Sequence, residues 1–290
     1  MNLRKLICVL AVAGAALGVD AEEVEGATNL VSEVRKWVAV NAYADVESAY
    51  WARGKIVDAR PYSSQFADVD LKLDRFGVLG AHAWSVSSFA HNGQSAGRRN
   101  AYNEVDWNLH YEYDWAFTEE GDWSLWNRVA RQWVSLPGYF PDCKTILEWH
   151  VSQALRNPYV TPYYLLRRAT DPEHWCYWEI GVLRTFDLEE VLKDLSFTVK
   201  FFGDCGDARH YRSQYGAKPN DPSSRYHGGL MALNLVLRLD YRLSENCGVF
   251  AYVQQFDIVD DDARETVKAS TAAEAKRDLT IGGVGLAVHF

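Results

Sequence analysis

The segment that decides the fold is Asn103-Glu-Val-Asp-Trp-Asn-Leu-His-Tyr-Glu-Tyr-Asp-Trp115. Every second residue from Val105 to Trp115 is aliphatic or aromatic, and the residues between them are acidic, amide or histidine. Successive side chains of a β-strand point to opposite faces, so the alternation predicts a strand with one apolar face and one ionisable face. Such a strand suits a barrel whose outer face meets lipid and whose inner face meets water.

The segment from Leu230 to Arg242 alternates in the same way. Its apolar positions are Met231, Leu233, Leu235, Leu237, Leu239 and Tyr241, and its polar positions are Asn234, Arg238, Asp240 and Arg242. A run of this length matches a tilted strand that crosses a bilayer. The residues expected to face lipid are Val105, Trp107, Leu233 and Leu235. An arginine at Leu235 should therefore be costly, whereas an arginine at Asn234 should cost little.

The same pattern predicts an all-β fold, an antiparallel up-and-down transmembrane β-barrel of about twelve strands. The strands are expected at 37–51, 64–74, 77–91, 102–116, 123–135, 144–156, 159–169, 174–186, 195–204, 228–243, 247–258 and 278–290. The alternation is irregular in 123–135, where a β-bulge would explain the phase of Asn127, Arg128 and Arg131. The rival fold is a periplasmic β-sandwich, which would stay soluble without detergent.

The connections between these strands sort by length into two alternating sets. The shorter set, expected at the periplasmic end, comprises 75–76, 117–122, 157–158, 187–194 and 244–246. The longer set, expected outside, comprises 52–63, 92–101, 136–143, 170–173, 205–227 and 259–277, with 170–173 as the exception in length. Outer-membrane barrels have this asymmetry. Residues 187–194 carry helical spacing and are expected to form one or two helical turns.

Composition excludes several classes of protein. The chain has 39 acidic and 30 basic residues, which argues against a nucleic-acid partner. Its 11 Trp, 16 Tyr and 12 Phe suit the two aromatic girdles of a membrane barrel. A mean hydropathy of −0.26 suits a barrel, in which only one face of each strand is apolar, better than a helical membrane protein.

The first residues predict export. Arg4 and Lys5 precede an apolar run to Leu17, and small residues end at Ala21, so residues 1–21 are expected to be a signal peptide cleaved after Ala21. Residues 22–36 are then a polar N-terminal arm, and 37–290 form the barrel in the bacterial outer membrane. The chain ends on Phe290, the feature that barrel-assembly machinery recognises in outer-membrane proteins. That machinery and outer-membrane lipid are the expected partners; the oligomeric state is open.

The cysteines leave two alternatives open. Cleavage would retain Cys143, Cys176, Cys205 and Cys247, and their spacing fits no metal motif. They could form one or two disulfides in an oxidising compartment, or they could be isolated small apolar residues.

A family resemblance rests on the first expected strand and its exit. Residues Asp45-Val-Glu-Ser-Ala-Tyr-Trp-Ala-Arg-Gly54, followed by Arg60-Pro61, resemble the opening motif of the TorF-type porins, a family of uncharacterised outer-membrane barrels. The strand from Asn103 to Tyr111 is similar to an acidic-apolar-acidic strand of that family. The resemblance covers about the first 115 residues and implies a barrel with pore activity, without a known substrate.

The candidate functional residues are the ionisable side chains on the predicted inner face. The pore-lining candidates are Asp45, Glu47, Asp68, Asp70, Glu104, Asp106, Glu112, Glu148, Lys200, Arg238 and Arg242. Charged side chains around a water-filled passage set ion selectivity, although opposite charges inside a small barrel can also simply pair. Acidic residues outnumber basic ones in this set, so we expect weak cation preference.

The expected function is passive diffusion of small polar solutes or ions, with no enzymatic activity, cofactor or metal. The alternative is a barrel with a plugged lumen and a structural or surface-binding role. A third reading is a lipase, because Ala90-His-Asn-Gly93 superficially resembles an element of outer-membrane phospholipases. No serine lies between His91 and Asn92 in this chain, so the expected nucleophile is missing.

Overall fold

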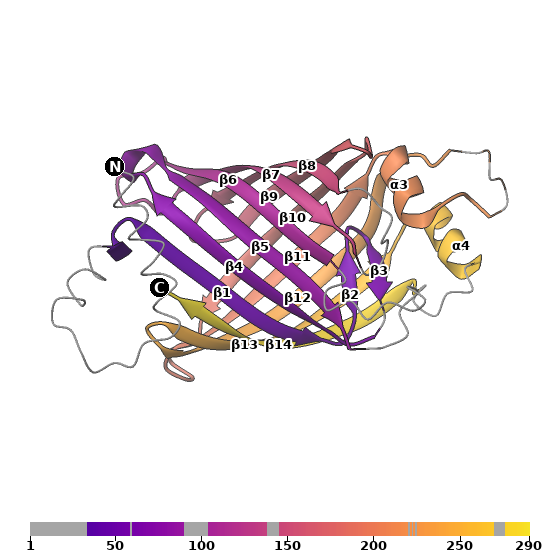
Figure 1. Ribbon diagram of the computed structural model, residues 1–290. Coiled ribbons are helices and arrows are strands. Elements are labelled where there is room, and N and C mark those ends of the chain that lie inside the picture. The colour runs from indigo at the N-terminus through magenta and orange to yellow at the C-terminus, as the bar shows by residue number, and fades with distance from the viewer. Residues whose placement is uncertain are drawn as a thin grey trace.

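The computed structural model describes residues 34–58, 60–89, 104–137, 145–219, 221, 223, 225–269 and 276–290. These residues form a closed antiparallel barrel of twelve strands (Figure 1). The barrel strands are β1 (Val38–Glu47), β4 (Tyr62–Lys72), β5 (Val78–Ser88), β6 (Glu104–Ala116), β7 (Ser124–Ser135), β8 (Ile146–Arg156), β9 (Thr161–Asp171), β10 (Cys176–Asp187), β11 (Leu195–Gly206), β12 (Gly229–Ser244), β13 (Cys247–Ile258) and β14 (Asp278–His289). The all-β barrel and its strand number are as the sequence predicts.

Each barrel strand pairs with its neighbours in the chain, and one seam closes the ring. At that seam β1 pairs with β4 on one side and with β14 on the other, from Asn41 opposite His289 to Glu47 opposite Gly283. The start of β1, the end of β14 and the shorter connections lie at one end of the barrel, here called the short-turn end. The longer connections lie at the opposite, long-loop end (Figure 1).

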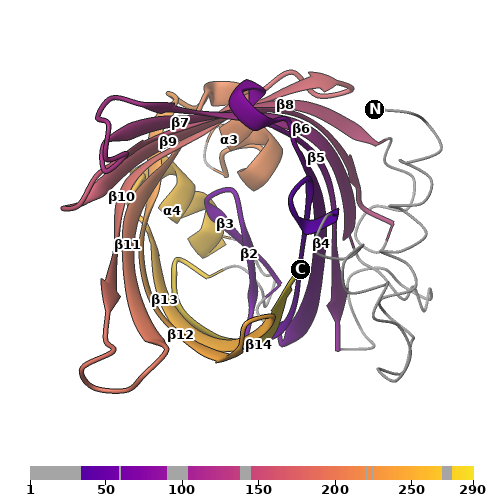
Figure 2. The same ribbon diagram turned by 90° about the vertical axis from the view of Figure 1, so that its left-hand side faces the viewer.

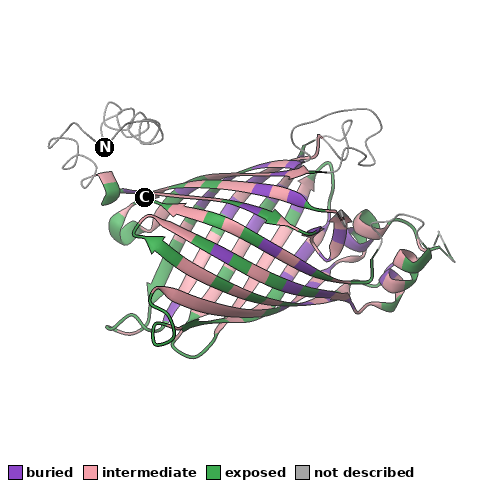
Figure 3. Ribbon diagram, turned by 90° about the horizontal axis from the view of Figure 1, so that it is seen from below, coloured by how far each residue is buried: buried purple, intermediate pink, exposed green. Residues whose placement is uncertain are grey.

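The alternation of side chains along the strands gives the wall two faces (Figure 3). On β6 the polar residues from Glu104 to His110 are buried inside the barrel, whereas Trp107 is 58% exposed and Leu109 is 56% exposed. Leu235 on β12 is also exposed. The apolar face is therefore the outer one, which inverts the arrangement of a water-soluble core.

The first expected strand, 37–51, is wrong at its far end. The barrel strand β1 ends at Glu47, and the following residues form a separate hairpin of β2 (Tyr50–Ala52) and β3 (Lys55–Asp58). The two residues of its turn, Arg53 and Gly54, have φ angles of 54° and 81°. Positive φ at both central residues is the mark of a tight hairpin turn whose twist matches its strands. Viewed along the barrel, this hairpin lies inside the ring of strands (Figure 2).

Two further details of register differ from the prediction. The pairing of β11 with β12 shifts between Asp204 and Cys205, so Met231 is fully buried rather than outward-facing. The bulge expected in 123–135 is absent, because β7 pairs without interruption with both β6 and β8. The irregular phase instead reflects Arg131, which packs over the ring of Trp149 at 5.1 Å on the outer face. Arginine can cover apolar surface with its stem and aromatic contact.

Two short helices follow β11 and β13 in connections that the sequence predicted only as loops. Asp207 caps α3 (Ala208–Tyr215) by accepting a hydrogen bond from the His210 backbone N–H, and α4 (Asp261–Ala269) follows Asp260, which accepts from Ala263 in the same way. At the other end, residues 188–194 make a single turn, in which Leu192 N–H donates to the Leu188 carbonyl. Among the described residues, no helix is long and apolar enough to cross a membrane.

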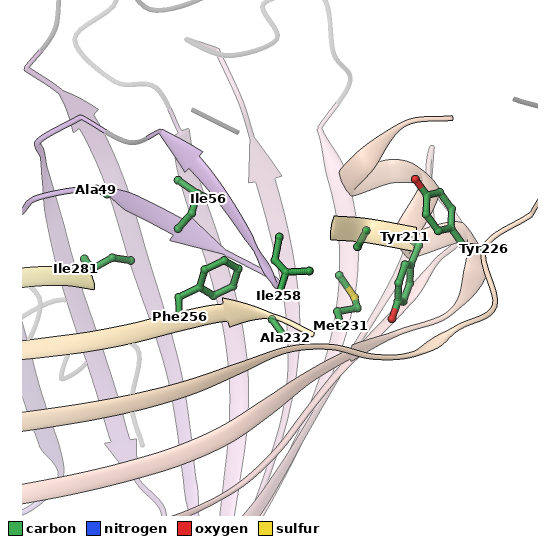
Figure 4. Packing of buried hydrophobic residues seen from close by; sticks show 10 residues of the cluster. Ala49, Ile56, Tyr211, Tyr226, Met231, Ala232, Phe256, Ile258 and Ile281 are labelled. Carbon is green, nitrogen blue, oxygen red and sulfur yellow. The ribbon is translucent and has the colours of Figure 1, made fainter. Parts of the chain in front are cut away.

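The hairpin and both helices meet at the long-loop end around an apolar cluster (Figure 4). The cluster comprises Ala49, Ile56, Tyr211, Tyr226, Met231, Ala232, Phe256, Ile258, Ala263 and Ile281. The hairpin 50–58 together with α3 and α4 is called the plug below. The cluster packs the plug against the inner faces of β12, β13 and β14 at that end, whereas the interior elsewhere is mostly polar.

Several predicted features fall outside the described residues. These are the signal peptide 1–21, most of the arm 22–36, the segment containing His91 and the position of Cys143. Cys176, Cys205 and Cys247 are free thiols.

Candidate functional site

The polar interior contains a central cavity of about 700 Å³ directly beneath the hairpin. Trp51, Ala52 and Arg53 of the hairpin line it at the long-loop side, and side chains of most barrel strands line the rest. It shares the lining residues Ser152, Leu165, Glu179 and Lys200 with a second cavity nearer the short-turn end. The interior is thus hollow toward the short turns and filled at the plug.

Arg53 at the tip of the hairpin is fixed to the barrel wall. Its guanidinium lies 2.8 Å from the carboxylate of Glu148, whose side chain is fully buried, and 5.2 Å from the centre of the Trp175 ring. Gly54 also allows the tip to pack closely, because a Cβ at this position would lie 2.9 Å from the end of the Met231 side chain. The tip is therefore held by charge, by an aromatic face and by close backbone packing.

Helix α3 holds the other side of the tip through backbone groups. Tyr215 donates its hydroxyl to the Gly54 carbonyl at 2.5 Å, and Lys55 donates to the Gln214 carbonyl at 2.7 Å. The Nε2 atom of His210 lies 3.3 Å from the Arg53 carbonyl. Burial lowers the pKa of His210 to about 3, so its ring is neutral near pH 7 and its Nε2–H can donate to that carbonyl.

The wall facing Arg53 carries a group of carboxylates from β6 and β8, here called the acidic pocket: Glu104, Asp106 and Glu148. Glu104 accepts a hydrogen bond from Tyr50 of the hairpin at 2.7 Å, and Asp106 accepts one from Gln132 at 2.6 Å. Gln132 on β7 lies opposite Glu148 on β8, so it separates Asp106 from Glu148. All three carboxylates were pore-lining candidates from the sequence.

The other candidates lie at different depths of the same interior. Asp45, Glu47, Lys200 and Arg238 line the central cavity with Glu104 and Asp106. Asp45 accepts from Ser64, Lys200 pairs with Glu179 at 2.9 Å, and Arg238 pairs with Asp240 at 2.6 Å. Glu47 accepts hydrogen bonds from Tyr62 and Tyr252.

The remaining candidates lie toward the short-turn end. Asp70 contacts His110 at 3.0 Å, with Asp68 close by, and Glu112 lies 3.4 Å from Arg128. Gly80 makes room for the Asp70–His110 contact, because a Cβ there would lie 2.2 Å from both partners. Arg242 lies at the rim, where it pairs with Asp194 of the 188–194 turn and its side chain is 63% exposed.

Sequence reasoning missed the cations that balance these acids. Arg53 was assigned to an outer loop, while Arg128 and Arg167 were not assigned to the lumen, yet all three line the central cavity. The lining holds five acids (Asp45, Glu47, Glu104, Asp106 and Glu179) and five bases (Arg53, Arg128, Arg167, Lys200 and Arg238). The tight Arg-Gly turn between two short apolar runs was the signal that could have placed Arg53 at a hairpin tip.

A second cluster combines Asp68, His82 and His110, whose potential ligand atoms lie within 4.8 Å of one another. Arg128 contacts Nδ1 of both histidines at 3.0 Å. A guanidinium can only donate, so each Nδ1 accepts and each ring carries its hydrogen on Nε2. Those Nε2–H groups are donors, as toward Asp70, and the adjacent positive charge opposes a metal ion. The cluster is therefore better explained as a hydrogen-bond network around Arg128.

Comparisons with known proteins agree on the fold. No protein-family model matches the chain. No curated protein matches it either. Among solved structures it is similar to an outer-membrane channel from Pseudomonas putida F1, with 9% sequence identity, a TM-score of 0.51, and coverage of 88% of this chain and 96% of that chain.

Two further similar structures have lower TM-scores. The KdgM porin has 8% identity and a TM-score of 0.45, with coverage of 87% of this chain and 99% of that chain. Outer membrane phospholipase A from Escherichia coli has 11% identity and a TM-score of 0.45, with coverage of 86% and 92%. At such identities, likeness extends to the barrel fold alone.

Proposed function

We propose that the protein is an outer-membrane channel of the porin type, through which small polar solutes or ions diffuse passively. The observation that carries this proposal is the inverted barrel, with exposed Trp107, Leu109 and Leu235 outside and a charged cavity of about 700 Å³ inside. A closed barrel leaves no unpaired sheet edge in lipid, and a hydrated, charged interior is what a diffusing ion needs.

The ends of the chain support export and membrane assembly. In this proposal residues 1–21 are removed as a signal peptide, and the barrel-assembly machinery recognises the last strand through Phe290. Phe290 pairs with β1 through two backbone hydrogen bonds to Val40, of 2.8 and 2.9 Å. The C-terminal residue is thus part of the seam that closes the barrel, and lipid surrounds the apolar outer face.

The motif that resembles the TorF-type porins lies partly in the hairpin. The motif residues Tyr50, Arg53 and Gly54 belong to the hairpin inside the lumen. A family motif that lies inside the lumen is consistent with membership in a porin family, and we include that membership in the proposal.

The second candidate is a plugged barrel with a structural or surface-binding role. The plug favours it, because Arg53 is bonded to Glu148 and the apolar cluster fills the long-loop end. The two candidates differ in whether the plug leaves a path for ions. The lipase reading has no support in the described part of the chain, since its His91 lies outside it; an assay with phospholipid micelles tests it directly.

Two measurements test the channel proposal. The protein should be extracted from washed membranes only by detergent and should migrate differently on a gel when unheated, as a folded barrel does. Purified protein in a planar bilayer should then give unitary currents in potassium chloride. Release into the soluble fraction would contradict the membrane location, and a folded barrel that never conducts would favour the plugged alternative.

A further inference from the structure

The acidic pocket has the composition of a site for a planar cation. Glu104, Asp106 and Glu148 are all at least nine-tenths buried, with 6%, 5% and 0% exposure. The charges of these same carboxylates act on the guanidinium of Arg53. Burying several carboxylates is costly unless cations or donors compensate them, so the wall is built to receive positive charge.

The groups around the pocket match a guanidinium in particular. Carboxylate oxygens offer paired acceptors for its fork of N–H donors, and Trp175 offers an aromatic face at 5.2 Å from the centre of the group. Arg53 uses one of these carboxylate oxygens, through the 2.8 Å contact of its Nη2 with Oε1 of Glu148, and its guanidinium lies over Trp175. The guanidinium of Arg53 is thus an example, within this chain, of the kind of group that this part of the wall binds.

The pocket also has acceptor capacity that Arg53 does not use. Oδ2 of Asp106 accepts from Gln132, but its buried Oδ1 has no hydrogen-bond partner among the described residues. The second cation acting on the pocket is Arg167 on β9. Three carboxyl groups therefore share two guanidinium groups beside the central cavity.

We propose that the acidic pocket is a binding site for small solutes that carry a guanidinium group, and that Arg53 fills this site in the state described here. Such a solute enters from the hollow short-turn side and competes with Arg53 for Glu148 and the face of Trp175. Displacement of Arg53 loosens the tip of the hairpin. The inference rests on the proposed channel only for the route by which the solute arrives, since binding itself needs no conduction.

The test uses the full barrel with Arg53→Ala, which empties the site, and two probes at equal ionic strength: methylguanidinium chloride and methylammonium chloride. Methylguanidinium should raise the thermal midpoint of the variant in detergent, with an apparent affinity at least about tenfold above that of methylammonium, because only the planar fork can engage paired carboxylate oxygens and stack on Trp175. Arg53→Met serves if the alanine variant does not fold, because methionine keeps the apolar stem.

Two matched second substitutions locate the effect. Glu148→Gln in the Arg53→Ala background should abolish the preference for methylguanidinium. Glu179→Gln removes a carboxylate from the lining of the central cavity, on β10 beside Lys200, and should leave the preference in place. Equal stabilisation by both probes, or an equal loss in both double variants, would overturn the site.

Bilayer recordings separate this inference from the proposed function. If the variants bind methylguanidinium but never conduct, the pocket stands and the channel proposal fails. If they conduct and methylguanidinium neither stabilises them nor reduces their current more than methylammonium does, the channel stands and the pocket is only an anchor for Arg53.

Discussion

At the long-loop end the inner faces of β12, β13 and β14 pack against the apolar side chains of the plug, whereas toward the short turns the interior keeps cavities lined by paired charges. The two halves share the same strands: β12 contributes the fully buried Met231 to the apolar cluster and Arg238 to the central cavity. The wall alternates throughout, so the difference lies in what each inward face meets. In one half the inner face meets the plug, and in the other it meets a cavity.

This difference is visible in the sequence of the strands once the structure is known. On β12, where the plug covers the inner face, apolar residues occupy both faces, as in Leu230-Met-Ala-Leu233. On β13 the inward residues there are Phe256 and Ile258, and the outward ones are Gln255 and Asp257. Where the interior is hollow, polar residues such as Arg238 and Asp240 alternate with leucines. A stretch that loses its alternation near the end of a barrel strand thus indicates a filled interior rather than a defect in the pattern.

Removal of the hairpin tests the difference between the two halves of the interior most directly. Replacing residues 49–57 with a short Gly/Ser linker should give the largest effect of all, because it takes away the part of the plug that lies directly over the central cavity. Single-channel conductance should rise strongly. The matched control replaces the 188–194 turn at the opposite end and should leave conductance near that of the unaltered protein. An unchanged conductance after hairpin removal would show that α3, α4 and the remaining loops close the barrel unaided.

Removing the ion pair between Arg53 of the plug and Glu148 of the barrel wall should lower the free energy of unfolding. Arg53→Ala leaves Glu148 buried without its guanidinium, and removing one partner of a buried ion pair costs about 3–5 kcal/mol. Urea unfolding in lipid vesicles measures this loss. The double variant Arg53→Ala, Glu148→Gln should lose less than the two single losses combined, because it leaves no uncompensated charge. Strict additivity would mean that the contact contributes nothing to the hairpin's position.

Leu235 and Val236 on β12 allow the outer and inner faces of the wall to be compared at neighbouring positions. Leu235→Arg places a charge in lipid and should cost about 2–4 kcal/mol if the residue lies near the bilayer midplane. Val236 is the next residue and lines the central cavity, so the same substitution there should cost clearly less. Equal losses in vesicle unfolding would show that the two faces are assigned wrongly.

Asn234 is not a suitable control position for the Leu235→Arg substitution. The sequence predicted that an arginine there would cost little, because its parity places it inside the barrel. The structure buries Asn234 almost fully and bonds it to Asp204 at 2.6 Å and to Gln254 at 2.8 Å. Inward-facing is not the same as water-facing, and alternation cannot tell the two apart.

The sequence was sufficient for features that depend on local chemistry. Period-two alternation located the twelve barrel strands, and connection lengths separated the two ends. It could not place Arg53, because the inward folding of the hairpin depends on Glu148, Trp175 and α3, which lie about 95 to 160 residues away in the chain. It also could not count lumen charges correctly, since Arg128 and Arg131 are both basic yet face opposite sides of the wall.

The smallest expected effect concerns ion selectivity in the hollow half. The candidates read from the sequence predicted weak cation preference, and the central cavity adds cations that bring its lining to five acids and five bases. Lys200 is paired with Glu179 at 2.9 Å and Arg238 with Asp240 at 2.6 Å, whereas Asp45 and Glu47 are held by hydroxyl groups. Acids without an ion-pair contact contribute more to the field of the lumen than ion-paired acids do, so a slight cation preference is still expected.

Reversal potentials under a salt gradient measure this preference. Two matched variants show which charged residues determine its sign. Lys200→Gln should shift the reversal potential toward cations, because it leaves Glu179 uncompensated, and Glu47→Gln should shift it toward anions by a similar small amount. Both shifts should shrink at high salt, where the Debye length falls to about 3 Å at 1 M. A strong anion preference in the unaltered protein would instead place the narrowest point at Arg128 and Arg167, on the wall between β7 and β9, and would show that the hairpin tip does not limit the passage.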